Sequence, residues 1–176
     1  MMVDAFAALA VVPGDRLLDL GFGGGLLSEL ALHAGARVTG VDRSAAMVAR
    51  ANRRFASAVA AGQARFLEGP AQALPLPDSA IDCVASINTL YFWPDLEAVA
   101  RELWRVLVPG GRLVLGWQTA KSVRAWPGHV HGFRAWDDAD IEAAATVAGF
   151  AIASIAPGHH RMVGDYRTLV ALRSAS

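Results

Sequence analysis

The stretch LLDLGFGGGLLSELA, Leu17 to Ala31, places four glycines between an apolar run and the predicted start of a helix. Glycine permits positive φ angles and lets a ligand lie directly against the backbone. The spacing G-x-G-x-G, from Gly21 to Gly25, differs from the dinucleotide fingerprint G-x-G-x-x-G/A, because Leu26 occupies the third small position. The loop therefore predicts a small-ligand site that is not built for a pyrophosphate.

Two acidic residues accompany this loop. Asp19 lies just before it, near the end of a predicted strand, where a carboxylate opposes a phosphate but attracts an ammonium group. Asp42 ends the next predicted strand, from where an acid can hydrogen-bond both hydroxyls of a ribose. Arg43 beside it leaves a 2′-phosphate open as an alternative, and Ser44 is a plausible N-cap. Together these residues favour a nucleoside with an amino-acid-like tail.

The elements that must position these residues alternate between strand-length apolar runs and helical patterns, which predicts a parallel sheet. The predicted strands are Arg16 to Leu20, Arg37 to Val41, Ala64 to Leu67, Ile81 to Ile87 and Gly111 to Gly116. The predicted helices are Gly25 to His33, Ala45 to Ala61 and Leu96 to Leu107. These elements form a doubly wound α/β core, whose ligands bind beyond the carboxyl ends of the strands.

The tail adds a helix from about Asp137 to Gly149 and strands at Phe150 to Ala156 and Thr168 to Leu172. Gly158 and Gly164 lie between those strands, in a connection short enough for a hairpin, so the last strand should be antiparallel. The fold class is thus a mostly parallel seven-stranded sheet. Its ligand-binding edge should collect the loops at 21 to 25, 42 to 44, 68 to 78, 88 to 95, 117 to 136 and 157 to 165.

Composition narrows the function classes. The 176 residues fit a single domain, 1–176, with 54% hydrophobic and 18% charged residues, and no apolar run approaches the roughly 20 residues of a membrane span. Sixteen basic and sixteen acidic residues give no broad positive field, which argues against nucleic acid as a partner. The opening lacks a basic leader, so we expect a cytoplasmic protein, and Cys83 reads as a buried filler.

In these motifs the sequence resembles the class I S-adenosylmethionine-dependent methyltransferases, particularly the small-molecule branch that includes quinone-biosynthesis enzymes. The resemblance covers residues 13 to 117 closely and the tail loosely. LLDLGFGGG resembles the first family motif, VTGVDRSAAMVARA the second, and the segment from Phe66 to Trp117 the third to fifth. The resemblance implies a Rossmann-like methyltransferase fold, S-adenosylmethionine as cofactor and methyl transfer to a small-molecule acceptor.

The same resemblance implies roles for individual residues. The backbone from Gly21 through Phe22 to Gly23 should lie against the methionine part of the cofactor, with Asp19 near its amino group. Asp42 would hold the ribose hydroxyls, Arg43 would lie beside the adenine, and Asn88 would border the methionine part.

Three features of the sequence depart from the family pattern. Gly69-Pro70-Ala71 replaces the usual Gly-Asp-Ala, so the adenine would rely on the Ala71 N–H and in part on Gln72. About sixteen residues precede the first strand, where relatives carry further helices, so the pocket is expected to be open or closed by a second subunit in a homodimer. The stretch TLYFWPD lacks the histidine found after the fourth strand in the family.

The acceptor site and the catalytic base are less defined. The tryptophan-rich loop from Trp117 to Trp136 should lie over the pocket, where it either forms an apolar acceptor wall or covers the core. A hydroxyl or protonated amine acceptor needs a base, for which His129 and His131 are candidates, followed by His159 and His160 in the predicted hairpin turn. Tyr91 could orient the acceptor but is a poor base. No carboxylate or cysteine set accompanies these histidines, so no metal is predicted.

Two other functions remain open from the sequence. A cofactor-binding protein without activity of its own, or one that needs a partner subunit, is consistent with the short amino end and Pro70. An NADP-dependent oxidoreductase is suggested by Arg43 but is disfavoured by the glycine spacing and by the lack of a Tyr-x-x-x-Lys motif.

Overall fold

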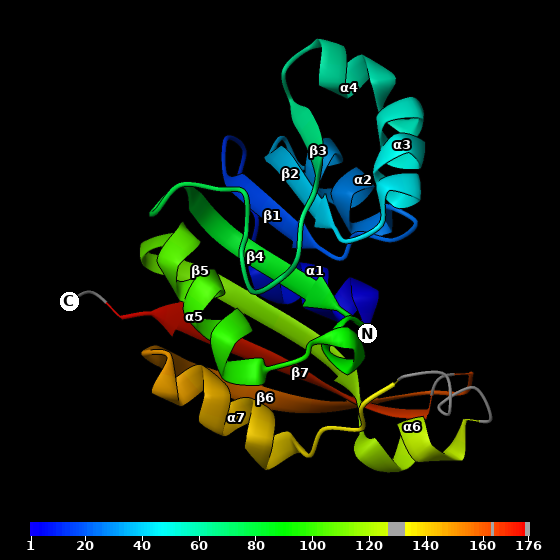
Figure 1. Cartoon of the computed structure of the whole chain (residues 1–176), viewed down its shortest axis with the longest axis vertical. Coiled ribbons are helices and arrows are strands. Elements are labelled where there is room, and N and C mark those ends of the chain that lie inside the picture. Colours follow the sequence, from blue (N-terminus) through cyan, green and yellow to red (C-terminus); the bar gives the residue numbers. More distant parts are fainter. Residues whose placement is uncertain (127–132, 163, 175–176) are drawn as a thin grey trace.

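The strands join in one seven-stranded sheet in the order β3-β2-β1-β4-β5-β7-β6, seen in a computed structural model that describes residues 1–126, 133–162 and 164–174 (Figure 1). The strands are β1 (Arg16–Leu20), β2 (Arg37–Asp42), β3 (Ala64–Glu68), β4 (Ile81–Ile87), β5 (Leu107–Gln118), β6 (Phe150–His160) and β7 (Gly164–Arg173). The helices are α1 (Met2–Leu9), α2 (Leu26–His33), α3 (Ala45–Arg54), α4 (Ala56–Ala60), α5 (Leu96–Val106), α6 (Ala120–Ala125) and α7 (Asp138–Val147), with a 3₁₀ turn, η1 (Leu90–Phe92).

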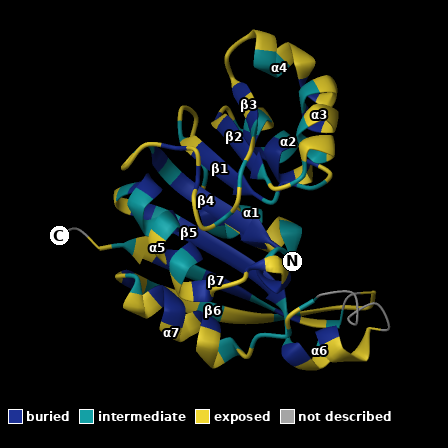
Figure 2. Cartoon of the chain, viewed as in Figure 1, coloured by how far each residue is buried: buried dark blue, intermediate teal, exposed yellow. Residues whose placement is uncertain are grey.

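Pairing within the sheet confirms the predicted topology. β1 to β5 pair in parallel, whereas β7 runs antiparallel to both β5 and β6. Successive side chains of a strand point to opposite faces, so Leu17 belongs to the core cluster that includes residues of α1 and α2, while Leu18 belongs to the cluster on the other face, which includes residues of α5 and α7. Figure 2 shows the central strands buried between these helices. The parallel strands therefore all end at the same edge of a rigid, two-sided core.

The last two strands are longer than predicted. Their ladder continues to the pair His160 and Gly164, so His159 and His160 belong to β6 rather than to a turn, and the predicted loop at 157 to 165 is wrong. Gly158 makes this possible, because a Cβ there would lie 2.2 Å from the Tyr166 ring of the facing strand. Gly158 was predicted to be a turn residue, but its lack of a side chain leaves room for the aromatic ring of the facing strand.

Two further boundaries were also wrong. The predicted helix Ala45–Ala61 is interrupted at Phe55, which leaves helical geometry with φ −106° and ψ 27°. Its ring stacks on Phe66 of β3 with centroids 5.3 Å apart, so packing against the sheet overrides the helical pattern. β5 begins at Leu107 rather than at Gly111, because Leu107 pairs with Ile81 before the register of the ladder shifts.

The segment read as one loop from Trp117 to Trp136 is partly regular structure. Trp117 lies in β5 with 1% of its surface exposed, and its Nε1 donates to Asp138 Oδ1 at 2.9 Å. α6 follows, and after the undescribed residues Trp136 donates from Nε1 to the Leu90 carbonyl at 3.0 Å. Two of the three tryptophans thus serve the core, as the covering alternative proposed.

Candidate functional site

A cavity of about 700 Å³, the glycine-loop cavity, opens where β1, β2 and β4 end. Every residue that the sequence assigned to the cofactor lines it: Asp19, Gly21, Phe22, Gly23, Asp42, Arg43, Pro70, Ala71, Gln72 and Asn88. These residues come from four separate segments, which the parallel sheet brings together at the carboxyl ends of its strands. The sheet edge thus forms one site from residues far apart in the sequence.

The glycine turn is shaped by close approach as well as by its φ angles. Gly21 has φ +70°, and a Cβ there would lie 2.3 Å from Thr89 Cγ2. Its N–H donates to the Val41 carbonyl at 2.7 Å, which ties the turn to the end of β2. Position 21 therefore excludes any side chain, and the backbone beside it forms the cavity wall.

Asp19 is a buried carboxylate at the end of β1, with 4% of its surface exposed. Burial raises its pKa from 3.8 to about 6, although the hydrogen bonds from Ser28 act in the opposite direction. Ser28 Oγ donates to Asp19 Oδ2 at 2.6 Å, and no salt bridge to Asp19 occurs among the described residues. A ligand ammonium group would supply the missing positive partner.

Asp42 ends β2 with its carboxylate half-buried in the same cavity. Its Oδ1 accepts from the Ser44 N–H at 3.0 Å, and Ser44 Oγ in turn accepts from Met47 N at 3.4 Å as the N-cap of α3. The predicted cap is confirmed. This turn holds the carboxylate at the cavity edge, where it can accept from two ligand hydroxyls.

A second cavity of about 570 Å³, the aromatic cavity, adjoins the first. Asn88 and Phe92 line both. Its remaining described lining consists of Tyr91, Gln118, Ser122, Val123, Ala125, Trp126, Phe133, Met162 and Gly164. Phe133 packs 4.7 Å from Phe92, 5.6 Å from Tyr91 and 5.0 Å from Trp126 between ring centroids. The rings make this cavity largely apolar.

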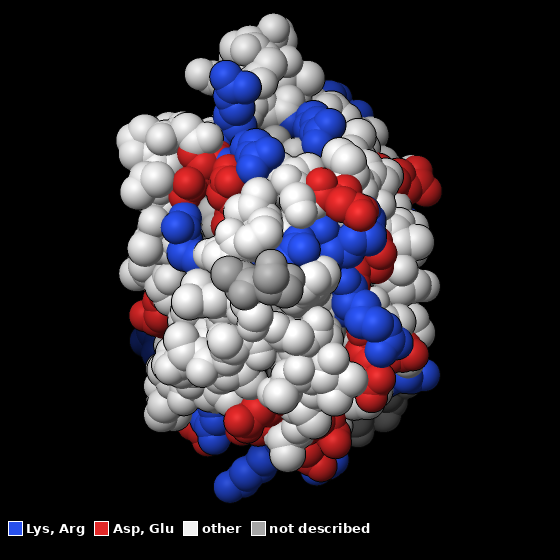
Figure 3. All heavy atoms as spheres, turned by 90° about the vertical axis from the view of Figure 1, so that its left-hand side faces the viewer, with Lys and Arg blue, Asp and Glu red and all other residues white. Residues whose placement is uncertain are grey.

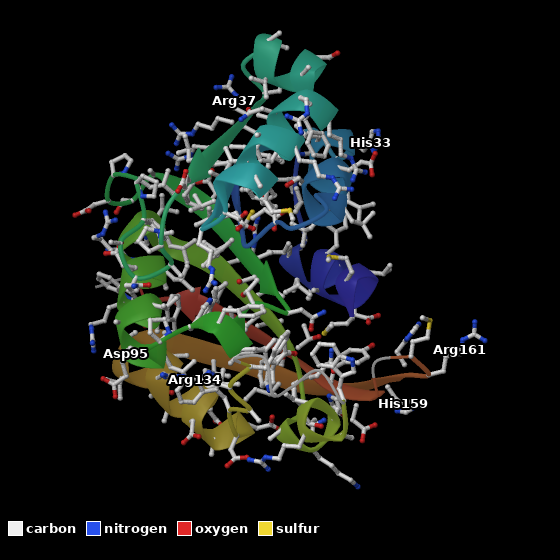
Figure 4. All side chains as sticks on the ribbon, turned by 45° about the vertical axis from the view of Figure 1, so that its right-hand side comes forward. His33, Arg37, Asp95, Arg134, His159 and Arg161 are labelled. Atoms are coloured by element: carbon white, nitrogen blue, oxygen red, sulfur yellow. The ribbon has the colours of Figure 1, made fainter. Side chains whose placement is uncertain are left out.

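The candidate bases fall in different places. Burial raises the pKa of Tyr91 to about 12, so this phenol stays protonated in the aromatic cavity. His159 Nδ1 lies 2.7 Å from Asp165 Oδ1 and neither His159 nor His160 is among the described residues lining the two cavities. Figure 4 shows His159 at the outer end of the β6–β7 hairpin. His129 and His131 lie outside the described residues.

The lining residues of the glycine-loop cavity that the sequence did not assign to the cofactor include Met2, Thr89 and Phe92. Met2 belongs to α1, a helix that was not predicted although Ala5 and Leu9 are buried one turn apart. Thr89 and Phe92 follow β4, in the stretch TLYFWPD that lacks the histidine of the family pattern. The burial period in α1 offered a signal, whereas the positions of Thr89 and Phe92 depend on the turn at η1.

Outside the two cavities, we examined the described residues for metal ligands, a reactive cysteine, membrane spans and charged patches. Within residues 1–126, 133–162 and 164–174 no group of three or more His, Cys, Asp or Glu side chains could hold a metal ion. Cys83 is buried, and burial raises its pKa to about 12, consistent with a structural filler. None of the described helices is both long and apolar enough to span a bilayer. On the face in Figure 3, charges of both signs are interspersed.

Comparison with known proteins identifies the family. Residues 18–115 match the family model described as a methyltransferase domain. The chain is 45% identical over 105 residues to a demethylmenaquinone methyltransferase of Thermus thermophilus, covering 57% of this chain and 46% of that protein. It is 31% identical over 138 residues to an uncharacterized methyltransferase, YdaC, of Bacillus subtilis, covering 77% of this chain and 74% of that protein.

A solved structure of similar shape supports the fold. A putative methyltransferase from Bacillus halodurans superposes with a TM-score of 0.83 at 16% identity, covering 99% of both chains. Four of the curated relatives are considerably longer, since the chain spans only 27% to 46% of their lengths. The family match confirms the expected cofactor class and disfavours an NADP-dependent oxidoreductase. The chain belongs to the methyltransferase domain family, with the class I Rossmann-like fold and S-adenosylmethionine as its cofactor.

Proposed function

We propose that this chain transfers a methyl group from S-adenosylmethionine to a small-molecule acceptor bound in the aromatic cavity. The observation that carries the proposal is that the predicted cofactor residues line one cavity, which shares Asn88 and Phe92 with the second. Adjacent cavities allow a donor and an acceptor to be held side by side, and such alignment is the main requirement for a displacement at carbon.

The glycine-loop cavity fits this cofactor by the chemistry of its groups. Asp19 offers a buried carboxylate to the ammonium group, Asp42 offers an acceptor to the ribose hydroxyls, and the turn at Gly21 leaves bare backbone for the methionine part. The Ala71 N–H and Gln72 would contact the adenine, since Pro70 replaces the usual acid. The bound cofactor would supply an electrophilic methyl group on sulfur.

The acceptor is apolar or aromatic in this proposal. The rings of Tyr91, Phe92, Trp126 and Phe133 line its cavity, and offset or edge-on packing of a planar ligand against such rings is favourable. Phe92 is 44% exposed and lies 5.7 Å from Arg43 Cζ, measured to its ring centroid, at the boundary with the cofactor. Phe92 would therefore contact both ligands.

Several finer expectations stay predictions. The role of His129 or His131 as a base, the cytoplasmic location and a homodimer all rest on the sequence reasoning alone. Tyr91 fits an orienting role better than that of a base, because its proton is retained at neutral pH. His159 is directed toward Asp165, and we assign it no part in the chemistry.

The test is transfer of a labelled methyl group from S-adenosylmethionine to a panel of phenols, naphthols and aliphatic alcohols of matched size. Labelled product with at least one aromatic acceptor, and little with the aliphatic compounds, is the expected result. Cofactor binding without transfer to any acceptor, alone or with a partner subunit, would support the non-catalytic alternative. Preferential labelling of the aliphatic alcohols would refute the aromatic assignment.

A further inference from the structure

Asn88 occupies the boundary between the two cavities in an unusual backbone conformation. It follows β4 with φ +60°, and its N–H donates to the Gly116 carbonyl of β5 at 2.8 Å. Apart from glycine, asparagine and aspartate are the residues that adopt the left-handed region most readily. The backbone conformation at this position therefore favours asparagine, aspartate or glycine over longer or branched side chains.

A hydrogen-bonded chain determines which way the Asn88 carboxamide faces. The Gln118 N–H donates to Tyr91 Oη at 2.6 Å, so the Tyr91 hydroxyl must direct its own single proton elsewhere. That proton goes to Asn88 Oδ1, 3.1 Å away. Because Oδ1 is taken as an acceptor, the free end of the carboxamide is Nδ2, which can only donate.

Nδ2 of Asn88 has no hydrogen-bond partner among the described residues. It is also not one of the buried, unpartnered polar atoms of the described chain, so this N–H₂ group keeps some accessible surface, on a residue that lines both cavities. A donor left accessible between the two cavities is suited to an oxygen lone pair of a ligand. The N–H₂ group cannot accept a hydrogen bond from an ammonium group.

We propose that Asn88 selects a phenol-type acceptor by donating from Nδ2 to its ionised oxygen, an inference that rests on the proposed methyl transfer. A hydrogen bond to a charged form favours that form, so the donor lowers the pKa of the bound phenol, whose proton leaves to water. The surrounding rings hold the aromatic body, while Asn88 holds the oxyanion at the boundary with the cofactor cavity. Tyr91 is a positioning residue, since it acts by fixing Asn88.

The probe for this inference is 4-nitrophenol, whose phenolate absorbs visible light, titrated on protein saturated with S-adenosylhomocysteine. The matched variants are Asn88→Gly, which keeps the left-handed backbone but removes the donor, and Val147→Ala, which truncates a 65% exposed apolar side chain of α7 that is not among the lining residues of either cavity. We expect the bound probe to titrate about one to two pH units lower in the wild type than in Asn88→Gly, with Val147→Ala resembling the wild type.

Two more variants test the mechanism. Asn88→Asp places a carboxylate at the same point, so it should bind the neutral probe and reject the phenolate. Tyr91→Phe removes the group that orients the carboxamide, so its probe pKa should lie between those of the wild type and Asn88→Gly. A Tyr91→Phe value equal to the wild type would overturn the positioning role.

The outcomes separate this inference from the proposed function. S-adenosylhomocysteine affinity is measured first in every variant, and its absence in the wild type would defeat the proposed function. If the cofactor product binds but the probe does not, or titrates at the same pH in the wild type and Asn88→Gly, the role of Asn88 is refuted while the cofactor site stands.

Discussion

The hydroxyl of Ser28 donates a 2.6 Å hydrogen bond to the Asp19 carboxylate across the glycine turn between β1 and α2. This bond lowers the pKa of Asp19, yet burial outweighs it and the net pKa is about 6. The ionised carboxylate of Asp19 is therefore unfavourable in the folded protein, and we propose that a ligand cation offsets this cost. A cost of this kind is expected at a binding site, where function and stability compete.

Asp19→Asn should therefore stabilise the free protein and weaken cofactor binding. An acid with a folded-state pKa of about 6 against 3.8 unfolded loses stability as pH rises between these values, by about 3 kcal/mol. The gain of Asp19→Asn in free energy of unfolding should be full above pH 6 and vanish below pH 4. Urea unfolding at both pH values measures it, and equal stabilities throughout would contradict the burial argument.

The same titration predicts a pH dependence of ligand affinity. Protonation of Asp19 below about pH 6 removes the charge that would pair with the ammonium group, so the affinity for S-adenosylhomocysteine should fall as pH falls. The dissociation constant is measured by calorimetry from pH 5 to 8, a range that spans the pKa of about 6. Asp19→Asn serves as the control, because its weaker binding should not depend on pH there. A matching slope in both proteins would assign the effect to another group.

Gly21→Ala should destabilise the fold and impair the glycine-loop cavity. The added methyl group would meet Thr89 Cγ2 at 2.3 Å, in a backbone with φ +70°, so we expect a loss of about 1 to 3 kcal/mol in free energy of unfolding. Gly24→Ala is the matched control, since a Cβ there meets no atom within 4 Å.

The double variant Gly21→Ala/Thr89→Ser separates sterics from backbone strain. Removing the Thr89 methyl group should recover the steric part of the loss and leave the part due to the φ angle. Equal stability of the single and double variants would show that contact with Thr89 does not limit position 21.

Phe92→Ala should weaken acceptor binding more than cofactor binding. The ring packs on Phe133 at 4.7 Å and is 44% exposed at the junction of the cavities. Its loss should raise the KM for an aromatic acceptor about tenfold, from an aromatic contact of about 1 to 1.5 kcal/mol. Val147→Ala, at a 65% exposed position of α7, controls for surface truncation. An unchanged KM would place the acceptor elsewhere.

The sequence predicted the fold, and it brought together residues that line the glycine-loop cavity, where local spacing determines the geometry. One helix, α2, and one strand, β2, separate Gly21 from the carboxylate of Asp42, and parallel pairing of β1 with β2 brings both residues to one edge of the sheet. Residues whose position depends on packing were less predictable. Trp117 looked like a loop aromatic but is covered by Asp138 and the core, and Met2 reaches the cavity only because α1 packs under β4 and β5.

The helix break at Phe55 and the long β6–β7 hairpin share one cause. In each case the backbone conformation depends on the packing of an aromatic side chain against a residue elsewhere in the sequence. Phe55 stacks on Phe66, and the Tyr166 ring lies over Gly158. Hydrophobic periodicity and turn propensity depend only on residues that are close in sequence, so they cannot predict such contacts. The acceptor cavity has the same origin, since its rings come from η1, the end of α6 and the segment before α7.

The central claim is that the glycine-loop cavity holds the nucleoside of S-adenosylmethionine through Asp42. Calorimetric titration with S-adenosylhomocysteine tests it in the wild type, Asp42→Ala and Glu68→Ala, the last removing an exposed carboxylate beside Asp42 on the neighbouring strand. We predict about micromolar binding by the wild type and Glu68→Ala, weakened by about 2 to 3 kcal/mol in Asp42→Ala. No heat with the wild type, or equal affinity in all three proteins, would contradict it.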